Sequence, residues 1–133
     1  LSGATNTFGA STYYAHEVGT DQVNSSGTTS IDAFIRSGDF DIDDGELFMS
    51  MKRFMPDYKF LVGNSKVTLF ISDYPSDTQT GSPLGPFTIT KTTDKVDTRA
   101  RGRLLSLKIE NDAAGETWRY GSFRMDAQPD GRR

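Results

Sequence analysis

Apolar residues alternate with polar ones through most of this sequence from residue 31 onward. Ile31, Ala33 and Ile35 begin the pattern, each separated from the next by one other residue. Successive side chains of a strand point to opposite faces of a sheet, so a period of two predicts half-buried strands. The pattern recurs at residues 47–55, 66–72, 86–90, 95–101, 104–110 and 117–127. Nowhere does a helical apolar stripe last for ten residues.

Turn-forming residues separate these segments. Glycine, proline, asparagine and aspartate gather in DDGE, VGNSK, DYPSDTQTGSPLGP, NDAAGE and QPDGRR. Seven to eight short strands joined by such turns predict an all-β fold, an antiparallel β-sandwich. In the last segment the apolar parity changes from Trp118 and Tyr120 to Phe123 and Met125. The glycine between them, Gly121, therefore predicts a β-bulge.

The chain has 133 residues, enough for one domain with one core. Residues 1–30 are rich in Gly, Ser, Thr and Asn, which predicts a linker or an extended arm before a domain at 31–133. An arm that docks on a neighbouring subunit is the functional alternative. The N-terminus has no signal-peptide pattern. It also lacks an initiator methionine, so we expect a fragment of a longer protein or a processed product.

Composition argues against several function classes. The net charge of −3 disfavours a protein that coats nucleic acid by bulk electrostatics. There is no cysteine and only one histidine, His16, which excludes thiolate chemistry and a histidine-rich zinc centre within one chain. No GxSxG motif, glycine-rich phosphate loop or apolar run of membrane-spanning length occurs. We therefore predict no enzyme activity, no cofactor and no membrane span.

The densest cluster of carboxylates is SGDFDIDDGE, residues 37–46. Counted from Asp39 as an EF-hand calcium loop, the glycine comes one place late and serine takes the final glutamate position, so no metal site is predicted. A strand that turns at Asp-Gly into the next strand fits better. Phe40 and Ile42 then face the core, and Asp39, Asp41 and Asp43 form an acidic face.

An arginine cluster offers the opposite charge. Arg99 and Arg101 share one face of a predicted strand, and Arg103 follows closely. We predict that these arginines form ion pairs with Asp39, Asp41 and Asp43, within one chain or across a subunit boundary. Contact with phosphate, with help from Arg119 and Arg124, is the alternative.

Two further function classes remain open from the residues alone. A carbohydrate-binding β-sandwich on a tail or cell surface would use Trp118, Tyr120 or Tyr74 as its stacking platform. A small hydrolase would use the acidic strand, and an Asp41→Asn change would then abolish its activity.

Four motifs occur in a fixed order and reach the end of the chain. They are SGDFD-x-x-DG at residues 37–45, RGR at 101–103, W-x-x-G-x-x-R at 118–124 and PDGRR at 129–133. With the strands between them, residues 31–133 resemble the C-terminal region of the tail nozzle of short-tailed bacteriophages, also called the tail tube or stabilisation protein. Residues 1–30 take no part in the resemblance.

The resemblance implies a structural protein of the virion tail, usually a ring of six copies. Such a ring lies below the portal and adaptor, carries tail fibres or a needle, and forms the conduit through which DNA leaves. DNA passes through it without sequence-specific binding. The family contributes no catalytic residues, so Asp39, Asp41, Asp43, Arg99, Arg101 and Arg103 are expected to make subunit contacts or ion pairs.

Overall fold

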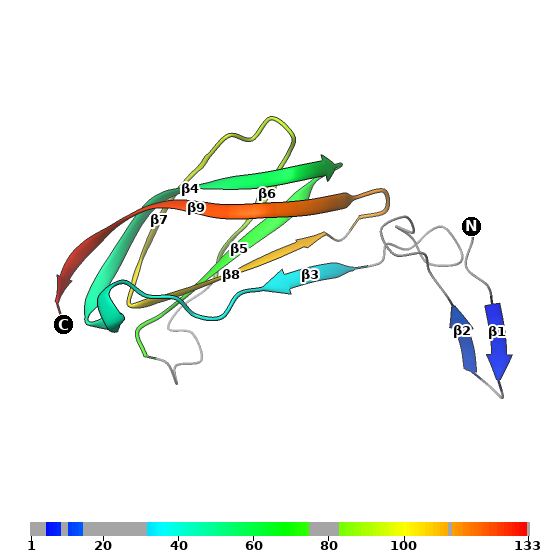
Figure 1. Ribbon diagram of the computed structural model, residues 1–133, viewed down its shortest axis with the longest axis horizontal. Helices are drawn as coiled ribbons and strands as arrows, with labels where there is room; N and C mark the ends of the chain where they lie inside the picture. Colours follow the sequence, from blue (N-terminus) through cyan, green and yellow to red (C-terminus); the bar gives the residue numbers. More distant parts are fainter. Residues whose placement is uncertain (1–4, 9–10, 15–31, 75–82, 112, 133) are drawn as a thin grey trace.

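The computed structural model describes residues 5–8, 11–14, 32–74, 83–111 and 113–132. These residues form an antiparallel β-sandwich of a four-stranded and a three-stranded sheet, together with a separate two-stranded hairpin (Figure 1). The predicted all-β fold and the predicted number of strands in the domain are therefore confirmed.

The four-stranded sheet has the order β3-β8-β5-β6, and the three-stranded sheet has the order β7-β4-β9. The strands of the first sheet are β3 (Ala33–Arg36), β8 (Leu104–Asn111), β5 (Ser65–Ser72) and β6 (Leu84–Ile89). The strands of the second are β7 (Val96–Gly102), β4 (Leu47–Val62) and β9 (Thr117–Arg132). Strands β3 and β6 form the edges of one sheet, and β7 and β9 form the edges of the other.

The hairpin lies inside the segment that the sequence predicted to be a linker or an arm. It pairs β1 (Thr5–Phe8) with β2 (Ser11–Tyr14) in a sheet of its own. His16 and Ile31 belong to residues 15–31, which lie outside the described residues.

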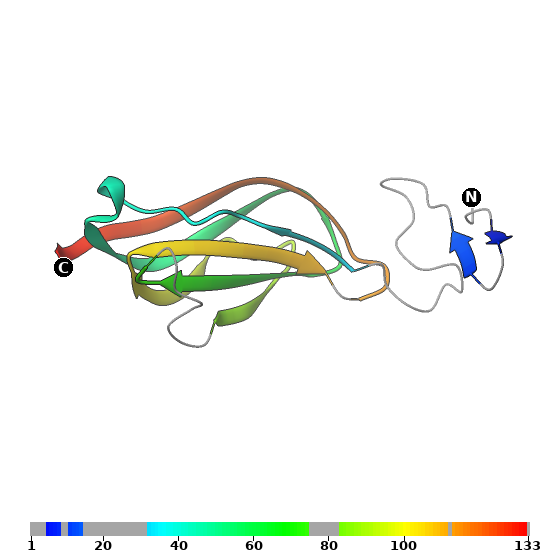
Figure 2. The same ribbon diagram turned by 90° about the horizontal axis from the view of Figure 1, so that it is seen from below.

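Two strands are far longer than the sequence predicted. β4 and β9 each span 16 residues, and they run side by side along the sandwich (Figures 1 and 2). The pairing changes from Asp57–Ser122 to Tyr58–Tyr120, so Gly121 is the extra residue of a β-bulge. A Cβ on Gly121 would lie 2.7 Å from the Asp57 carbonyl oxygen, which explains why glycine stands there. The predicted bulge is confirmed.

The C-terminal residues continue β9 instead of forming the turn that QPDGRR predicted. Residues 128–132 remain in the strand, with Gln128 opposite Ser50 and Arg132 opposite Leu47. Pairing with the first half of β4 holds this segment extended, although its composition favours a turn.

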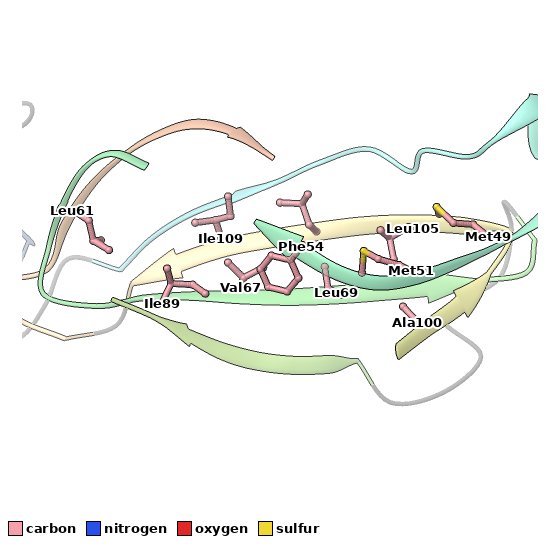
Figure 3. Packing of buried hydrophobic residues seen from close by; sticks show 11 residues of the cluster. Met49, Met51, Phe54, Leu61, Val67, Leu69, Ile89, Ala100, Leu105 and Ile109 are labelled. Atoms are coloured by element: carbon pink, nitrogen blue, oxygen red, sulfur yellow. The ribbon is translucent and has the colours of Figure 1, made fainter. Parts of the chain in front are cut away.

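The core lies between the two sheets and draws on five strands (Figure 3). Most of its buried members come from the predicted apolar faces of β4, β5, β6, β7 and β8. Phe54, at 0% exposure, was not on the predicted face of β4, because an irregularity between Met51 and Arg53 shifts the parity of the strand. The Phe54 ring contacts Phe87 edge-on at 5.6 Å and stacks on Phe123 at 5.4 Å, which joins β4 to β6 and β9. The core residues are Met49, Met51, Phe54, Leu61, Val67, Leu69, Ile89, Ala100, Leu105, Leu107 and Ile109.

Strand β3 was predicted correctly, but the burial of its side chains was not. All four of its residues are exposed, including Phe34 at 67% and Ile35 at 53%, whereas the alternation placed Ala33 and Ile35 in the core. The reason is position, because β3 is an edge strand that pairs only with β8.

The predicted hairpin through the acidic segment is wrong. β3 and β4 lie in different sheets, so residues 37–46 cross from one sheet to the other. Phe40 makes an isolated bridge to Leu105, and Phe40 and Ile42 pack against the core as predicted. The chain then forms a short 3-10 turn, η1 (Asp43–Gly45), before β4 begins.

A polar cluster lies at one end of the core and consists of Tyr58 on β4, Tyr120 on β9 and Ser65 on β5. Tyr58 and Tyr120 are cross-strand partners whose rings meet edge-on at 5.1 Å. The Tyr58 hydroxyl lies 2.7 Å from the Ser65 hydroxyl, which is fully buried. Burial raises the pKa of both tyrosines above its ordinary value, because it disfavours the charged phenolate. The Tyr120 hydroxyl is buried and has no hydrogen-bond partner among the described residues.

Replacing each of these tyrosines by phenylalanine should have a different effect on the free energy of unfolding. Tyr58→Phe removes the partner of a buried hydroxyl and should lower the free energy of unfolding by about 1–2 kcal/mol. Tyr120→Phe removes an unpaired buried hydroxyl and should leave stability unchanged or raise it by up to about 1 kcal/mol. Urea unfolding of the two variants beside the parent chain measures both. Equal destabilisation by the two changes would contradict this account of the cluster.

Candidate subunit-contact surface

The outer face of the three-stranded sheet carries most of the predicted arginine cluster. Asp97, Arg99 and Arg101 alternate along β7 and are exposed, whereas Ala100 between them is buried. The predicted shared face of Arg99 and Arg101 is therefore confirmed. A shallow hollow of about 700 Å³ borders β7 and β4 along residues 97–101 and 50–52.

Ion pairs on this face connect all three strands. Arg101 Nε donates to Asp130 Oδ2 at 2.7 Å, which ties β7 to the end of β9. Arg53 Nε lies 3.5 Å from Asp97 Oδ1 and 3.9 Å from Asp126 Oδ2, so β4 contributes a cation between two carboxylates. These side chains are about half exposed, and such pairs stabilise a fold by less than about 1 kcal/mol each.

Arg101 also contacts an aromatic ring, whereas Arg99 has no such partner. The Arg101 guanidinium carbon lies 4.4 Å from the centre of the Phe48 ring. In the part of the chain that the structure describes, the Arg99 side chain makes no hydrogen bond or ion pair. Its charge is free for a contact outside the chain.

Arg103 has a different role from its two neighbours. It lies between β7 and β8, and its Nε donates to the Gly45 carbonyl oxygen at 2.6 Å. Asp43, Asp44 and Gly45 all have positive φ, a conformation that aspartate tolerates better than most residues and that glycine adopts freely. Arg103 thus holds the η1 turn in place.

The acidic segment does not form the predicted acidic strand face. Asp39, Asp41 and Asp43 are exposed, but Asp43 belongs to η1 and no regular strand contains the other two. Among the described residues no ion pair joins these aspartates to Arg99, Arg101 or Arg103. Asp41 and Arg103 both lie near Gly45, where an added Cβ would be 3.0 Å from Asp41 Oδ2 and 3.7 Å from Arg103 Nη2. Pairing across a subunit boundary stays a prediction.

The carboxylates that the arginines contact within the chain were not predicted from the sequence. Asp126 and Asp130 lie on β9, and Asp97 lies on β7 itself. Asp126 and Asp130 are four residues apart along β9, and residues of equal parity share one strand face. This spacing could have predicted that the two carboxylates lie on the same face of the sheet. Because a turn was predicted at QPDGRR, Asp130 was expected to lie outside the strand that contains Asp126.

The aromatic residues of the carbohydrate-binding alternative do not form one exposed platform. Trp118 and Tyr120 are partly buried against the core, and Trp118 Nε1 donates to Asn111 Oδ1 at 3.1 Å. Tyr74 is 40% exposed, beyond the end of β5. Stacking on a sugar needs an open ring face, which the packing of Trp118 and Tyr120 restricts.

Exposed apolar side chains gather where a sheet edge is free. Phe34 and Ile35 lie on the edge strand β3. Met55, Phe60 and Val62 lie on the second half of β4, beyond the end of its pairing with β7 at Phe54. Edge strands with exposed apolar side chains are templates for pairing with another chain.

Metal and membrane signals are absent from the described ranges. No group of three His, Asp or Glu side chains in those ranges is placed to hold a metal ion. No helix in them is long and apolar enough to cross a membrane. A comparison with protein-family models and with curated proteins finds no match to this sequence.

Arg103 and Arg99 form a matched pair for a stability test. Arg103→Gln removes a charged donor from a partly buried carbonyl and should lower the free energy of unfolding by about 1–2 kcal/mol. Arg99→Gln should change it by less than about 0.5 kcal/mol, because the side chain is exposed and makes no hydrogen bond or ion pair with the described residues. Urea unfolding measures both values. A loss at Arg99 as large as that at Arg103 would show that Arg103 does not hold η1 as described.

Proposed function

We propose that this chain is a structural, non-enzymatic domain of the tail nozzle of a short-tailed bacteriophage. It contributes to tail assembly and to the DNA-ejection conduit through contacts between subunits. The four ordered motifs of residues 37–133 support the family. In the virion tail it forms a ring with other copies of the chain, and by resemblance the ring contains six copies in total. Portal or adaptor proteins and fibre or needle proteins are its partners at the ends of the ring.

One observation carries the assembly role. Of the six large apolar side chains that are exposed in the described residues, five lie on stretches of strand with a free edge. These five are Phe34, Ile35, Met55, Phe60 and Val62. Exposed apolar residues scattered over a surface need no explanation, but their concentration on unpaired edges is typical of surfaces that another chain covers.

Charge on the same molecule supports the proposal. The ion pairs among the described residues use Asp57, Asp97, Glu110, Asp126 and Asp130, and none of them involves Arg99 or the aspartates of residues 39–44. Unpaired groups of opposite sign on one chain favour contacts between copies, because complementary charge sets the relative orientation of subunits.

Substitution of the exposed edge residues tests the assembly role. Phe34→Lys and Phe60→Lys should each weaken self-association by about 10- to 100-fold, because burial of one phenylalanine contributes about 1.5–3 kcal/mol. Tyr74→Lys is the matched control, since this ring is also exposed but lies beyond the end of β5. Light scattering over a dilution series at moderate salt measures the mass of each variant.

A parent chain that stays monomeric at every concentration would contradict the assembly role. The phage assignment has its own test in the parent gene and its neighbours. An open reading frame that extends upstream and lies beside a portal or adaptor gene supports it. A freestanding gene of this length in an unrelated setting argues against it.

A further inference from the structure

The second half of β4 has a strand partner on one side only. β9 pairs with β4 as far as Val62, whereas β7 pairs with it only from Met49 to Phe54. Among the described residues, no backbone hydrogen bond joins residues 57–62 to the turn that leads into β7. We call residues 57–62 on this side the distal β4 edge. Its backbone donors and acceptors are available to another strand.

Proline explains where β7 stops. Pro56 lies two positions after Phe54, the last residue of β4 that pairs with β7. Proline has no backbone N–H to donate to a neighbouring strand. The chain that enters β7 therefore begins to pair with β4 only at Phe54, where Val96 lies opposite it. The distal β4 edge begins immediately after the proline and is six residues long.

A groove of about 420 Å³ runs beside this edge. Residues 56–61 of β4 form one wall, and Ile89, Thr90, Lys91 and Thr93 form the other. Phe60 is 51% exposed and Val62 is 36% exposed along the same stretch. A free strand edge with a groove and exposed apolar side chains is the arrangement that accepts an added strand from another chain.

The described chain also contains an element that needs such a surface. The hairpin of β1 and β2 forms a sheet of its own, and each of its strands has four residues. A two-stranded hairpin is at best marginally stable in water and gains stability when it joins a larger sheet. Its strand sequences, TNTF and STYY, are uncharged and rich in β-branched and aromatic residues, which suits a strand within a sheet.

We propose that the β1–β2 hairpin of one copy adds to the distal β4 edge of a second copy and extends the three-stranded sheet. A strand of four residues fits within the six residues of this edge. The inference rests on the proposed function, because it requires contact between subunits, and it names the surface through which one of those contacts is made.

The edge strand β3 is a poorer acceptor for the hairpin. Lys108 Nζ lies 5.1 Å from the centre of the Phe34 ring, and the Arg36 guanidinium lies 4.1 Å from that of Phe70. The exposed ring of β3 thus already lies near a cation, and the cation of β3 already lies over a ring of β5. Strand β3 therefore provides the matched control for the experiment.

Cross-linking tests the proposal directly because the chain has no native cysteine. Full-length chains carrying Thr12→Cys are mixed with full-length chains carrying Lys59→Cys and treated with a short bismaleimide. The proposal predicts a product that joins one chain of each kind. Lys91→Cys, on the opposite wall of the groove, serves as a second acceptor, and Ala33→Cys on β3 should give no product above background.

A proline in the donor provides the second readout. Thr7 pairs with Thr12 in the hairpin, so adding Thr7→Pro to the Thr12→Cys chain disrupts β1 and should abolish the product. Circular dichroism and urea unfolding of each variant confirm that the sandwich is intact.

The remaining outcomes overturn the inference. They are equal product with Ala33→Cys, no product with either groove acceptor, and, in a chain carrying both Thr12→Cys and Lys59→Cys, a link formed only within that chain. Light scattering of the same mixtures separates the two hypotheses. An oligomer without the predicted cross-link overturns the hairpin contact alone, whereas a monomer overturns the proposed function as well.

Discussion

The pairing of β4 with β9 is the interaction on which the rest of this structure depends. It extends over the whole length of both 16-residue strands, and β4 contributes Met49, Met51 and Phe54 to the core beneath it. β7 adds to only part of this two-stranded ribbon, and the four-stranded sheet packs against its inner face. Irregularities in the ribbon decide which side chains point inward. The extra residue at Gly121 shows this, because it returns Phe123 and Met125 to the core side.

The same ribbon also determines which surfaces are left for other molecules. Since β4 extends beyond its pairing with β7, one side of its second half has no strand partner among the described residues, and Phe60 is exposed on this stretch. Since β9 continues to Arg132, Asp130 reaches Arg101 and completes a row of ion pairs across the outer face. One long pairing thus provides both an internally paired charged face and a free apolar edge. Such edges are normally shielded in proteins that act alone, which is why the arrangement favours an assembly component.

Much of the fold was predictable because alternation reports directly on strands with one buried face. Alternation in residues 66–72 and 104–110 predicted the apolar faces of β5 and β8, and Val67, Leu69, Leu105, Leu107 and Ile109 are buried, whereas Ile71 is only partly buried. The bulge at Gly121 was also predictable, since an extra residue shifts the parity of the pattern that follows it. The same reasoning failed at β3, because alternation cannot distinguish a strand beneath a second sheet from a strand at the edge. It failed again at QPDGRR, where pairing with β4 outweighs local turn preference.

By itself, the sequence determined an all-β chain, the approximate positions of the strands of the sandwich, most of its core and the shared face of Arg99 and Arg101. These properties depend on local periodicity, which a chain carries whatever its partners are. Only the tertiary structure decided that Arg101 pairs with Asp130 and that Arg103 holds η1 instead of pairing with the aspartates. It also decided that the acidic segment crosses between the sheets and that the second half of β4 has a free edge. These outcomes depend on which strands become neighbours, and sheet order is set by the long-range packing of the whole core.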